Sequence, residues 1–421
     1  MDIKFVRQNP DKVKEGAQKK NIQVDVDRVL ELDETKRGII KELELLRAQQ
    51  NKLSDQVRQE KDADKKNSLI AASRELGPKM KELEENLAAV EPEFDKLMHQ
   101  IPNPPLEDVI VGKDDSGNQV LRKVKEPTKF DFEPKDHMDL GVALDIIDTD
   151  RAAKTSGSRF GFLKNEAARM EFALVNFALD ILLKEGFSLV IPPVMLKPEM
   201  MAAMGYTERG ADEIYYLEKD NLYLVGTSEQ MIGPMHADEI FELKDLPKRY
   251  VGFSSCFRRE AGSYGKDTKG ILRVHQFDKL EMFSFTHPDK SKEEHELMLS
   301  IEEKLMQKLE IPYQVINICS GDLGDPAAKK YDIEAWIPSQ KRYRETHSTS
   351  NCTDFQTRRL NIRFRQKDGS LEFAHALNGT AIAMGRIIIA ILENYQQKDG
   401  SIVIPKVLQK YMGIKKIVKK K

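Results

Sequence analysis

The 421-residue sequence has only three cysteines, Cys256, Cys319 and Cys352, and no Cys-x-x-Cys pair. An odd number of cysteines without such pairs argues against a disulfide framework and a cysteine zinc site, so we expect a reducing compartment. The chain also lacks an apolar run of about 18 residues, and its N-terminus has no signal-peptide core. These absences predict a soluble, cytoplasmic protein with no membrane partner.

A strong excess of charge of one sign is missing as well. The chain has 67 basic and 69 acidic residues and a formal net charge of −2. This balance excludes a surface built throughout to attract nucleic acid, but it allows local basic patches. The P-loop pattern is also absent, so a phosphate site would have to use arginine side chains. The length and the 40% hydrophobic content predict two or three domains with a large core.

Two apolar heptad ladders occupy much of the first hundred residues. They run from Ile39 to Val57 and from Leu69 to Leu97, and this spacing predicts two long helices. The polar stretch QEKDADKKN between them predicts a reversal, and therefore an antiparallel hairpin that projects as an arm over about 27–98. Gly77 and Pro78 keep the second ladder in phase, which predicts a kink and not a break.

Periodicity alone leaves two interpretations of this hairpin, a dimerisation or spacer device and a nucleic-acid-binding arm. Basic residues gather toward its predicted tip, where they either belong to a solvated loop or contact phosphates. They are Lys52, Arg58, Lys61, Lys65, Lys66 and Arg74.

A proline-rich linker, HQIPNPP, follows the hairpin. Beyond it, short strand-like runs outnumber the amphipathic stretches and often follow one another directly, which favours an α+β fold with a mainly antiparallel sheet flanked by helices. The expected strands are 187–191, 222–225, 249–254, 278–285, 313–318 and 332–337, and the expected helices are 165–185 and 290–309. The predicted domains are 1–101, a linker over 102–118, a catalytic domain over 119–413 and a basic tail over 414–421.

The segment SSCFRREAGSYGKDTKGILRVHQFDKLEMF, residues 254–283, holds the most concentrated set of chemical groups. Arg258, Arg259 and Glu260 follow a predicted strand, where an arginine can bind two oxygens of a phosphate or carboxylate; an ordinary surface ion pair is the alternative. The loop over 262–270 is rich in glycine and lysine and could contact phosphate. It lacks the strand-to-helix context that makes such loops diagnostic of a phosphate site.

Two residues of the next predicted strand also carry alternatives. Phe277 either stacks on a base or belongs to the core. Glu281 alternates with the apolar Leu280 and Met282, so its carboxylate is expected to be buried and to need a cation. The ammonium group of a ligand is one candidate for that cation.

Five segments extend this pattern along the chain. They are GFSLVIPPVM at 186–195, GTSEQ at 226–230, the segment CFRREAGSYGKDTKGILRVHQFDKLEMF, YRETHSTSNCTDFQTRR at 343–359 and HALNGTAIAMGRIIIAILENYQ at 375–396. The first, third and fifth resemble motifs 1, 2 and 3 of the class II aminoacyl-tRNA synthetases, and the whole set is similar to the common bacterial-type seryl-tRNA synthetases. The resemblance includes the helical arm and covers essentially the whole chain, and no class I signature is present.

The resemblance implies an enzyme that activates L-serine with ATP and Mg²⁺ to seryl-adenylate, releasing pyrophosphate. It then implies transfer of serine to the 3′ end of tRNA(Ser), and also of tRNA(Sec), by a homodimer whose arm lies across the long variable arm of the tRNA. A protein zinc site is not expected.

Residue roles follow from the same resemblance. The catalytic residues would be Arg258, Glu260 and Arg386. The serine-binding residues would be Thr227, Ser228, Glu229, Arg258, Glu281, Asn378 and Thr380. The ATP-binding residues would be Arg258, Arg259, Glu260, Val274, Phe277, Glu345, Thr346, His347, Ser348 and Arg386, with Glu345 and Ser348 holding Mg²⁺ through ATP.

Two departures and two alternatives accompany the resemblance. The run THSTS at 346–350 contains His347 and Thr349 where the family commonly has hydroxyls and a cysteine, and the pair Gly77-Pro78 is unusual in the arm. A noncatalytic seryl-synthetase-like binding protein is one alternative, but the complete set of motif residues argues against it. A ligase that loads a carrier protein is the other, and the full-length arm argues against that.

Overall fold

The computed structural model describes residues 2–261 and 270–419. The chain forms two compact units. The N-terminal unit comprises Met1–Gln18 and Ile22–Pro102. The second unit comprises Lys19–Asn21 and Asn103–Lys421, and we call it the catalytic unit after the domain predicted over 119–413. Each unit has hydrophobic clusters of its own, as expected for domains that fold around separate cores.

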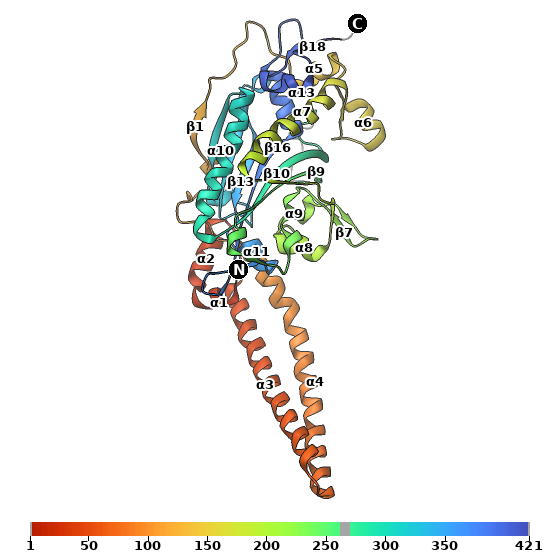
Figure 1. The fold of residues 1–421 in the computed structure, drawn as a ribbon, viewed down its shortest axis with the longest axis vertical. Coiled ribbons are helices and arrows are strands. Elements are labelled where there is room, and N and C mark those ends of the chain that lie inside the picture. The colour runs from red at the N-terminus through yellow and green to blue at the C-terminus, as the bar shows by residue number, and fades with distance from the viewer. Residues whose placement is uncertain (1, 262–269, 420–421) are drawn as a thin grey trace. The chain divides into compact units, whose positions relative to one another are not determined.

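The N-terminal unit consists of α1 (Ile3–Gln8), α2 (Pro10–Lys19), α3 (Val26–Gln59) and α4 (Ala63–Gln100). The last two form the expected helical hairpin (Figure 1). The carboxylates of Asp25 and Asp62 accept hydrogen bonds from backbone N–H groups in the first turns of α3 and α4, as N-cap residues do. The predicted hairpin is confirmed, and its connection is shorter than the polar stretch QEKDADKKN.

The arm is held by little apolar burial. Leu43 and Leu76 are buried along its length, whereas the larger cluster of buried residues lies at its base and includes Phe94. Ion pairs also join the two helices, for example Arg28 to Glu93 at 2.9 Å. The helix α4 passes through both of its internal prolines without ending, which agrees with the unbroken phase of the sequence ladder.

The catalytic unit is organised around one eight-stranded sheet. Its strand order is β1-β11-β12-β13-β16-β10-β9-β4, and every neighbouring pair is antiparallel except β4 with β9. The bounds are β1 Gln119–Val124, β4 Ser188–Val190, β9 Lys248–Phe257, β10 Gln276–Thr286, β11 Tyr313–Asn317, β12 Lys329–Ile337, β13 Arg342–Asn351 and β16 His375–Ala383. The expected α+β fold with a mainly antiparallel sheet is therefore confirmed.

Three helices, α7 (Asn165–Leu182), α10 (Ser291–Leu309) and α12 (Met384–Asn394), pack against this sheet. The alternation of side chains along β10 separates the two faces. Leu280 and Met282 join the main core with the three helices, whereas Phe283 and Phe285 join a second cluster. One face of β10 is thus committed to the helices, and the other is left for a site and its support.

The smaller elements complete the unit. The helices are α5 His137–Ala143, α6 Thr149–Ser156, α8 Pro198–Met204, α9 Glu229–Ile232, α11 Phe355–Arg359 and α13 Gln409–Met412. The strands are β2 Ile147–Asp148, β3 Phe162–Leu163, β5 Met195–Leu196, β6 Tyr216–Leu217, β7 Leu222–Leu224, β8 Ile240–Glu242, β14 Arg363–Arg365, β15 Leu371–Phe373, β17 Ile402–Val403 and β18 Lys416–Ile417. Within the described ranges, no helix combines the length and the apolar character that are needed to span a bilayer.

The expected strands correspond to β4, β7, β9, β10, β11 and β12, and the expected helices correspond to α7 and α10. The apolar run AIAMGRIIIAIL is divided between a strand and a helix. Ala381–Ala383 end β16, and the helix begins at Met384. A continuous apolar run fits a buried strand and a buried helix equally well, so periodicity cannot place the junction.

We expect Gly252→Ala to destabilise the catalytic unit. A Cβ at Gly252 of β9 would lie 2.6 Å from Ser228 Oγ and 2.7 Å from Ile232 Cδ1, and both of these side chains are fully buried. Overpacking of this kind costs about 1–3 kcal/mol. Thermal unfolding should show a lower midpoint for this variant. The control is Gly226→Ala, whose Cβ would have its nearest contact at 3.6 Å; equal effects of the two changes would contradict the prediction.

Candidate active site

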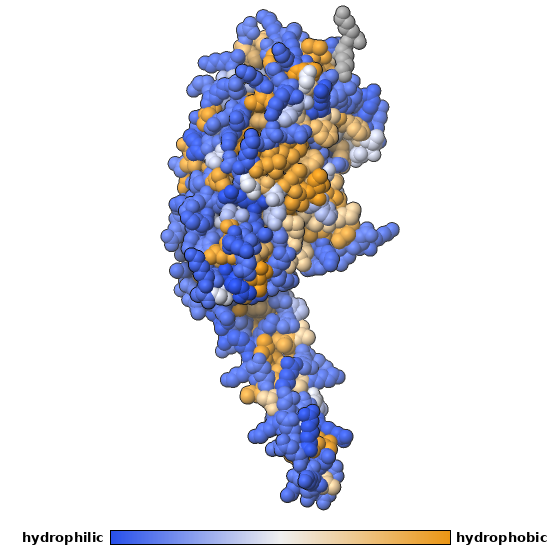
Figure 2. Space-filling view, in the orientation of Figure 1, coloured by the Kyte–Doolittle hydropathy of each residue, from blue (hydrophilic) through white to orange (hydrophobic). Residues whose placement is uncertain are grey.

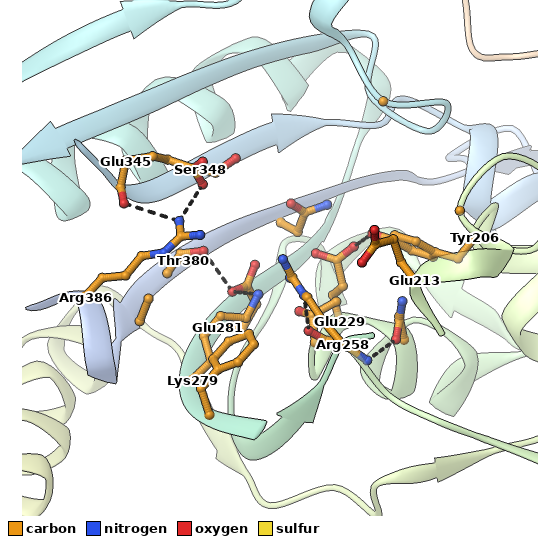
Figure 3. Close-up of a pocket in the computed structure, with 18 of the residues that line it drawn as sticks. Tyr206, Glu213, Glu229, Arg258, Lys279, Glu281, Glu345, Ser348, Thr380 and Arg386 are labelled. Carbon is orange, nitrogen blue, oxygen red and sulfur yellow. Dashed lines mark hydrogen bonds and ion pairs between the residues drawn. The ribbon is translucent and has the colours of Figure 1, made fainter. Parts of the chain in front are cut away.

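A cleft of about 650 Å³ opens beside β9, β10, β13 and β16 of the catalytic unit (Figure 3). Thirteen of the sequence-predicted site residues line it, from five separate parts of the sequence. They are Thr227, Glu229, Arg258, Glu260, Val274, Phe277, Glu281, Glu345, Thr346, Ser348, Asn378, Thr380 and Arg386. The antiparallel neighbours of β10 bring these parts together, since β10 pairs with β9 on one side and β16 on the other.

The structure does not place Ser228, Arg259 or His347 among the lining residues. The hydroxyl of Ser228 is buried and donates a hydrogen bond to the backbone oxygen of Gly252 at 3.2 Å. The guanidinium of Arg259 lies 5.8 Å from the ring centroid of Tyr215. These two residues support or flank the cleft wall.

His347 is removed from the lining by a bulge in the sheet. The register of β12 with β13 steps from Ile333 opposite His347 to Glu334 opposite Glu345, so Thr346 is an extra residue. Such a bulge reverses the alternation of side chains beyond it. The side chain of His347 is 1% exposed, and burial lowers its pKa to about 4. It is therefore a neutral core histidine at neutral pH.

One end of the cleft is lined by arginines and an aromatic ring. The guanidinium of Arg258 lies 5.3 Å from the ring centroid of Phe277, and its Nε donates to the backbone oxygen of Gly226 at 3.2 Å. Arg273, which also lines the cleft, forms an ion pair with Glu260 at 3.2 Å. A planar cation beside an aromatic face is suited to bind a base together with a phosphate or carboxylate.

Arg386 of α12 and Glu345 of β13 form a second charged pair in the cleft (Figure 3). The guanidinium lies 3.0 Å from the carboxylate and also donates to the backbone oxygen of Glu345 at 3.2 Å. Desolvation raises the pKa of Glu345, but the charges of Arg386, Lys330 and Arg258 outweigh it and lower the pKa to about 2. This carboxylate therefore stays ionised at physiological pH.

The other end of the cleft is acidic and is lined by hydroxyl groups. Glu281 is 2% exposed; its Oε2 lies 2.7 Å from Lys279 Nζ and accepts a hydrogen bond from Thr380 Oγ1 at 3.1 Å. Glu229 accepts a hydrogen bond from the hydroxyl of Tyr206, and burial together with the charge of Glu281 raises the pKa of Glu229 to about 7. Two buried carboxylates so arranged favour a cationic ligand.

Thr227 adds a polar atom that is available to a ligand. Its Oγ1 is buried and has no hydrogen-bond partner within the described part of the chain. A buried hydroxyl without a partner costs free energy unless something else supplies the bond. A ligand donor or acceptor at this end of the cleft would remove that cost.

Among the lining residues that the sequence reasoning missed are three with polar side chains, Tyr206, Lys279 and Lys330. Lys279 could have been found, because Phe277, Lys279 and Glu281 occupy every second position of one strand and therefore share a face. Tyr206 follows α8 and lies outside the five segments, and no sequence signal pointed to it. Residues 262–269 of the glycine- and lysine-rich loop over 262–270 lie outside the described residues.

A further carboxylate, Glu302 of α10, lies directly behind the acidic end. It is fully buried, and neither of its oxygens has a hydrogen-bond partner among the described residues. A Cβ placed on Gly379, between Asn378 and Thr380, would lie 3.0 Å from its Oε1. Burial, with the nearby charge of Glu281, raises the pKa of Glu302 well above its ordinary value. The side chain is therefore a neutral acid that supports the cleft wall.

We expect Glu302→Gln to become increasingly stabilising as the pH rises from 5 to 8. In the wild type, the unfolded chain loses this proton near the ordinary pKa of 4.5 while the folded chain keeps it. Stability therefore falls with rising pH, by about 1.4 kcal/mol per unit until the folded pKa is reached. The amide removes this titration. The difference in unfolding midpoint between variant and wild type should grow with pH, and Glu293→Gln on the same helix is the control. A constant difference would contradict the prediction.

In the described part of the chain, no group of three or more His, Cys, Asp or Glu side chains is arranged to hold a metal ion. Oxygen atoms suited to a hard cation are nevertheless present at the Glu345 end of the cleft. Ser348 lines it beside Glu345, and Asp332 Oδ1, opposite Ser348 in the sheet, is buried without a partner among the described residues. Carboxylate and hydroxyl oxygens of this kind fit Mg²⁺, which is bound through few protein ligands and keeps its waters.

Both units match known protein families. Residues 1–105 match the seryl-tRNA synthetase N-terminal domain, and residues 215–395 match the tRNA synthetase class II core domain (G, H, P, S and T). Curated relatives described as serine–tRNA ligase include one from Dictyoglomus turgidum, 47% identical with 100% of both chains covered. Another, from Rubrobacter xylanophilus, is 46% identical with 98% of both chains covered.

Solved structures agree. The seryl-tRNA synthetase from Pyrococcus horikoshii complexed with ATP superposes with a TM-score of 0.91 at 44% identity and 100% coverage of both chains. The cytoplasmic serine–tRNA ligase from Naegleria fowleri in complex with AMP gives 0.85 at 37% identity, with 98% of this chain and 96% of that chain covered. A cleft that joins a basic, aromatic end to an acidic, hydroxyl-lined end, on a fold shared over its full length, shows that the chain belongs to the seryl-tRNA synthetase family of class II aminoacyl-tRNA synthetases.

Proposed function

We propose that the cleft binds ATP at its arginine end and L-serine at its acidic end, joins them as seryl-adenylate and then transfers serine to tRNA(Ser). The observation that carries this proposal is the position of Arg258. Its guanidinium lies beside Phe277, and on the same strand as Phe277 stands Glu281. The groups suited to a nucleotide and to an amino acid therefore meet at one arginine.

In the activation step, an oxygen of the serine carboxylate attacks the α-phosphorus of ATP. The new carboxyl–phosphorus bond forms as the bond to the bridging oxygen breaks, and pyrophosphate leaves with that electron pair. The step requires two anions to be held together in line, so positioning and charge neutralisation are the catalysis and no protein nucleophile is needed. Arg258 would bind the α-phosphate and the carboxylate, and Arg386 the terminal phosphate.

Adenine recognition would use the face of Phe277, with Glu260 and the backbone of Val274 at the ring edge. Glu345 and Ser348 would hold Mg²⁺, which supplies charge neutralisation and orientation of the phosphates when bound. The cationic neighbours of Glu345 lower its pKa by more than burial raises it. The carboxylate therefore stays ionised and available as a ligand.

Selection of serine would rest on polar groups at the acidic end. Glu281, Thr380 and Asn378 line it, and Thr227 adds a hydroxyl without a partner among the described residues. Bound alanine would leave such groups without a hydrogen-bond partner, which would cost about 1–3 kcal/mol of binding free energy for each buried group. Threonine would have to be excluded by the shape of the cleft, because its hydroxyl could satisfy the same groups.

The helical arm would bind the tRNA. The basic residues that gather toward its tip, from Lys52 to Arg74, are exposed, and few side chains are buried between the two helices. Contacts from such a surface go mainly to sugar and phosphate, so recognition would depend on the shape of the long variable arm and not on the anticodon. The same mode of recognition would admit tRNA(Sec).

We also propose a homodimer. Large apolar side chains stand exposed on α7 and around β4: Phe172 at 65%, Leu189 at 44% and Ile191 at 76%. Figure 2 shows apolar surface gathered over the region of α7 and β9. Contiguous exposed apolar surface marks an interaction site, and a second copy of this chain is the partner that motif 1 implies. A soluble, cytoplasmic dimer would be the working form.

We expect Glu281→Gln to raise the KM for serine at least tenfold and to change the KM for ATP little. The amide cannot pair with the serine ammonium, and a lost bond to a charged group costs about 1.5–3 kcal/mol. The assay is ATP–pyrophosphate exchange without tRNA, in which the wild type should respond to serine alone among the amino acids. Glu260→Gln is the mirror control and should affect ATP more than serine. Equal effects on both substrates would contradict the assignment of Glu281, and no wild-type exchange would contradict the proposed function.

We expect deletion of residues 35–95, closed by a short linker, to leave exchange nearly intact and to abolish tRNA charging. The two helices are adjacent at the point of closure, because Lys36 Nζ lies 5.1 Å from the ring centroid of Phe94. Retained structure is checked by circular dichroism and by exchange itself. Loss of both activities in a folded protein would argue against a separate tRNA-binding arm.

A further inference from the structure

Lys279 is a cation in the cleft to which the proposed function gives no role. Its side chain is 7% exposed, and its Nζ lies 2.7 Å from Oε2 of Glu281, whose side chain is 2% exposed. Both charges have therefore lost most of their water, and each depends on the other. The same Oε2 also accepts the hydrogen bond from Thr380 at 3.1 Å. The carboxylate of Glu281 is thus paired with a cation of the protein itself.

The sheet fixes where along the cleft this lysine stands. The pairing of β10 with β9 is in register without interruption from Gln276 to Phe285, so Phe277, Lys279 and Glu281 project from the same face. Successive members of this row are about 7 Å apart. Figure 3 shows Lys279 and Glu281 side by side, with Arg258 nearby. Lys279 therefore stands between the ring suited to adenine and the carboxylate suited to an ammonium group, which is where a carboxylate and an α-phosphate would meet.

The charges in this part of the cleft make the pair responsive to a ligand. Lys279 and Arg258 are the cations, and Glu281 and Glu229 are the carboxylates, with the neutral Glu302 behind the wall. A serine zwitterion brings one ammonium and one carboxylate. If Lys279 stayed on Glu281, two ammonium groups would share one carboxylate while the new carboxylate was left with Arg258 alone. Moving one ammonium removes the repulsion and supplies the second cation.

We propose that Lys279 is a resident counter-ion of the serine site: it occupies the cation position on Glu281 in the free enzyme, yields it to the serine ammonium, and moves to the serine carboxylate beside Arg258. This inference rests on the proposed function of the same cleft. No covalent bond is made or broken. The exchange makes binding depend on a ligand that carries both charges, because an amine without a carboxylate displaces Lys279 and offers it nothing in return.

The test uses Lys279→Met, which keeps the length and the apolar stem and removes the charge. Binding of L-serine and of serinol, which has the ammonium and hydroxyl groups but no carboxylate, is measured by calorimetry at constant pH. We expect the variant to bind serinol about tenfold more tightly than the wild type, since nothing competes for Glu281, and to bind L-serine no better or more weakly. Lys290→Met, an exposed lysine paired with Glu293, is the control and should leave both affinities unchanged.

Other results overturn the proposal. If Lys279 only fixes the orientation of Glu281, the methionine variant binds serinol and L-serine more weakly by similar factors. If Lys279 does not compete for the site, serinol affinity does not change. Lys279→Gln provides a second neutral variant should the methionine variant unfold.

A measurement on the wild-type protein tests the proposed movement of Lys279 directly. A crystal structure with L-serine should show Lys279 Nζ more than about 4 Å from Glu281 Oε2, beyond ion-pair range; retention of the 2.7 Å pair would overturn the proposal. The same preparation is assayed for serine-dependent exchange. Absence of exchange would contradict the proposed function itself, whereas normal exchange with the pair retained would remove only the role of Lys279.

Discussion

The antiparallel register of β10 with β9 and β16 is the constraint on which the site depends. Because the register with β9 is unbroken, alternate residues of β10 are divided between the helix-covered core and the cleft. Leu280 and Met282 are held by the core, and that packing fixes the direction in which Lys279 and Glu281 point. A slip by one residue would exchange the two sets. The hydrophobic core therefore positions the charged groups without touching a ligand.

The cleft also shows how buried charge can be made to select a ligand. Glu229, Glu281 and Glu302 lie close enough to influence one another, and burial raises the pKa of Glu229 and of Glu302. Such a cluster is unfavourable unless cations or protons compensate it. Lys279 supplies one cation and the proton on Glu302 another form of compensation. Under the proposed function, the ammonium group of serine would be a further cation that improves this balance, and it would thereby contribute to the affinity for serine.

The N-terminal unit follows a different physical logic. Its arm buries few side chains between the helices, and the helices are maintained by their caps, by ion pairs and by the cluster at their base. Low burial leaves most of the surface polar and open to solvent. That is a disadvantage for stability and an advantage for contact with a polyanion, because phosphate binding needs exposed basic side chains on a firm support. The catalytic unit instead uses burial to place each group.

Much of this could be predicted from the sequence, since the signals were local. Heptad spacing determined the hairpin, alternating patterns determined β9 to β12, and the motifs supplied thirteen of the residues that line the cleft. What the sequence by itself could not determine was the packing of distant segments. Only the tertiary structure decided that a bulge turns His347 into the core, that Tyr206 joins the acidic end, and that Lys279 occupies Glu281. A sequence pattern indicates the face of an element on which a residue lies, whereas strand pairing and burial in the folded chain decide which groups that face contacts.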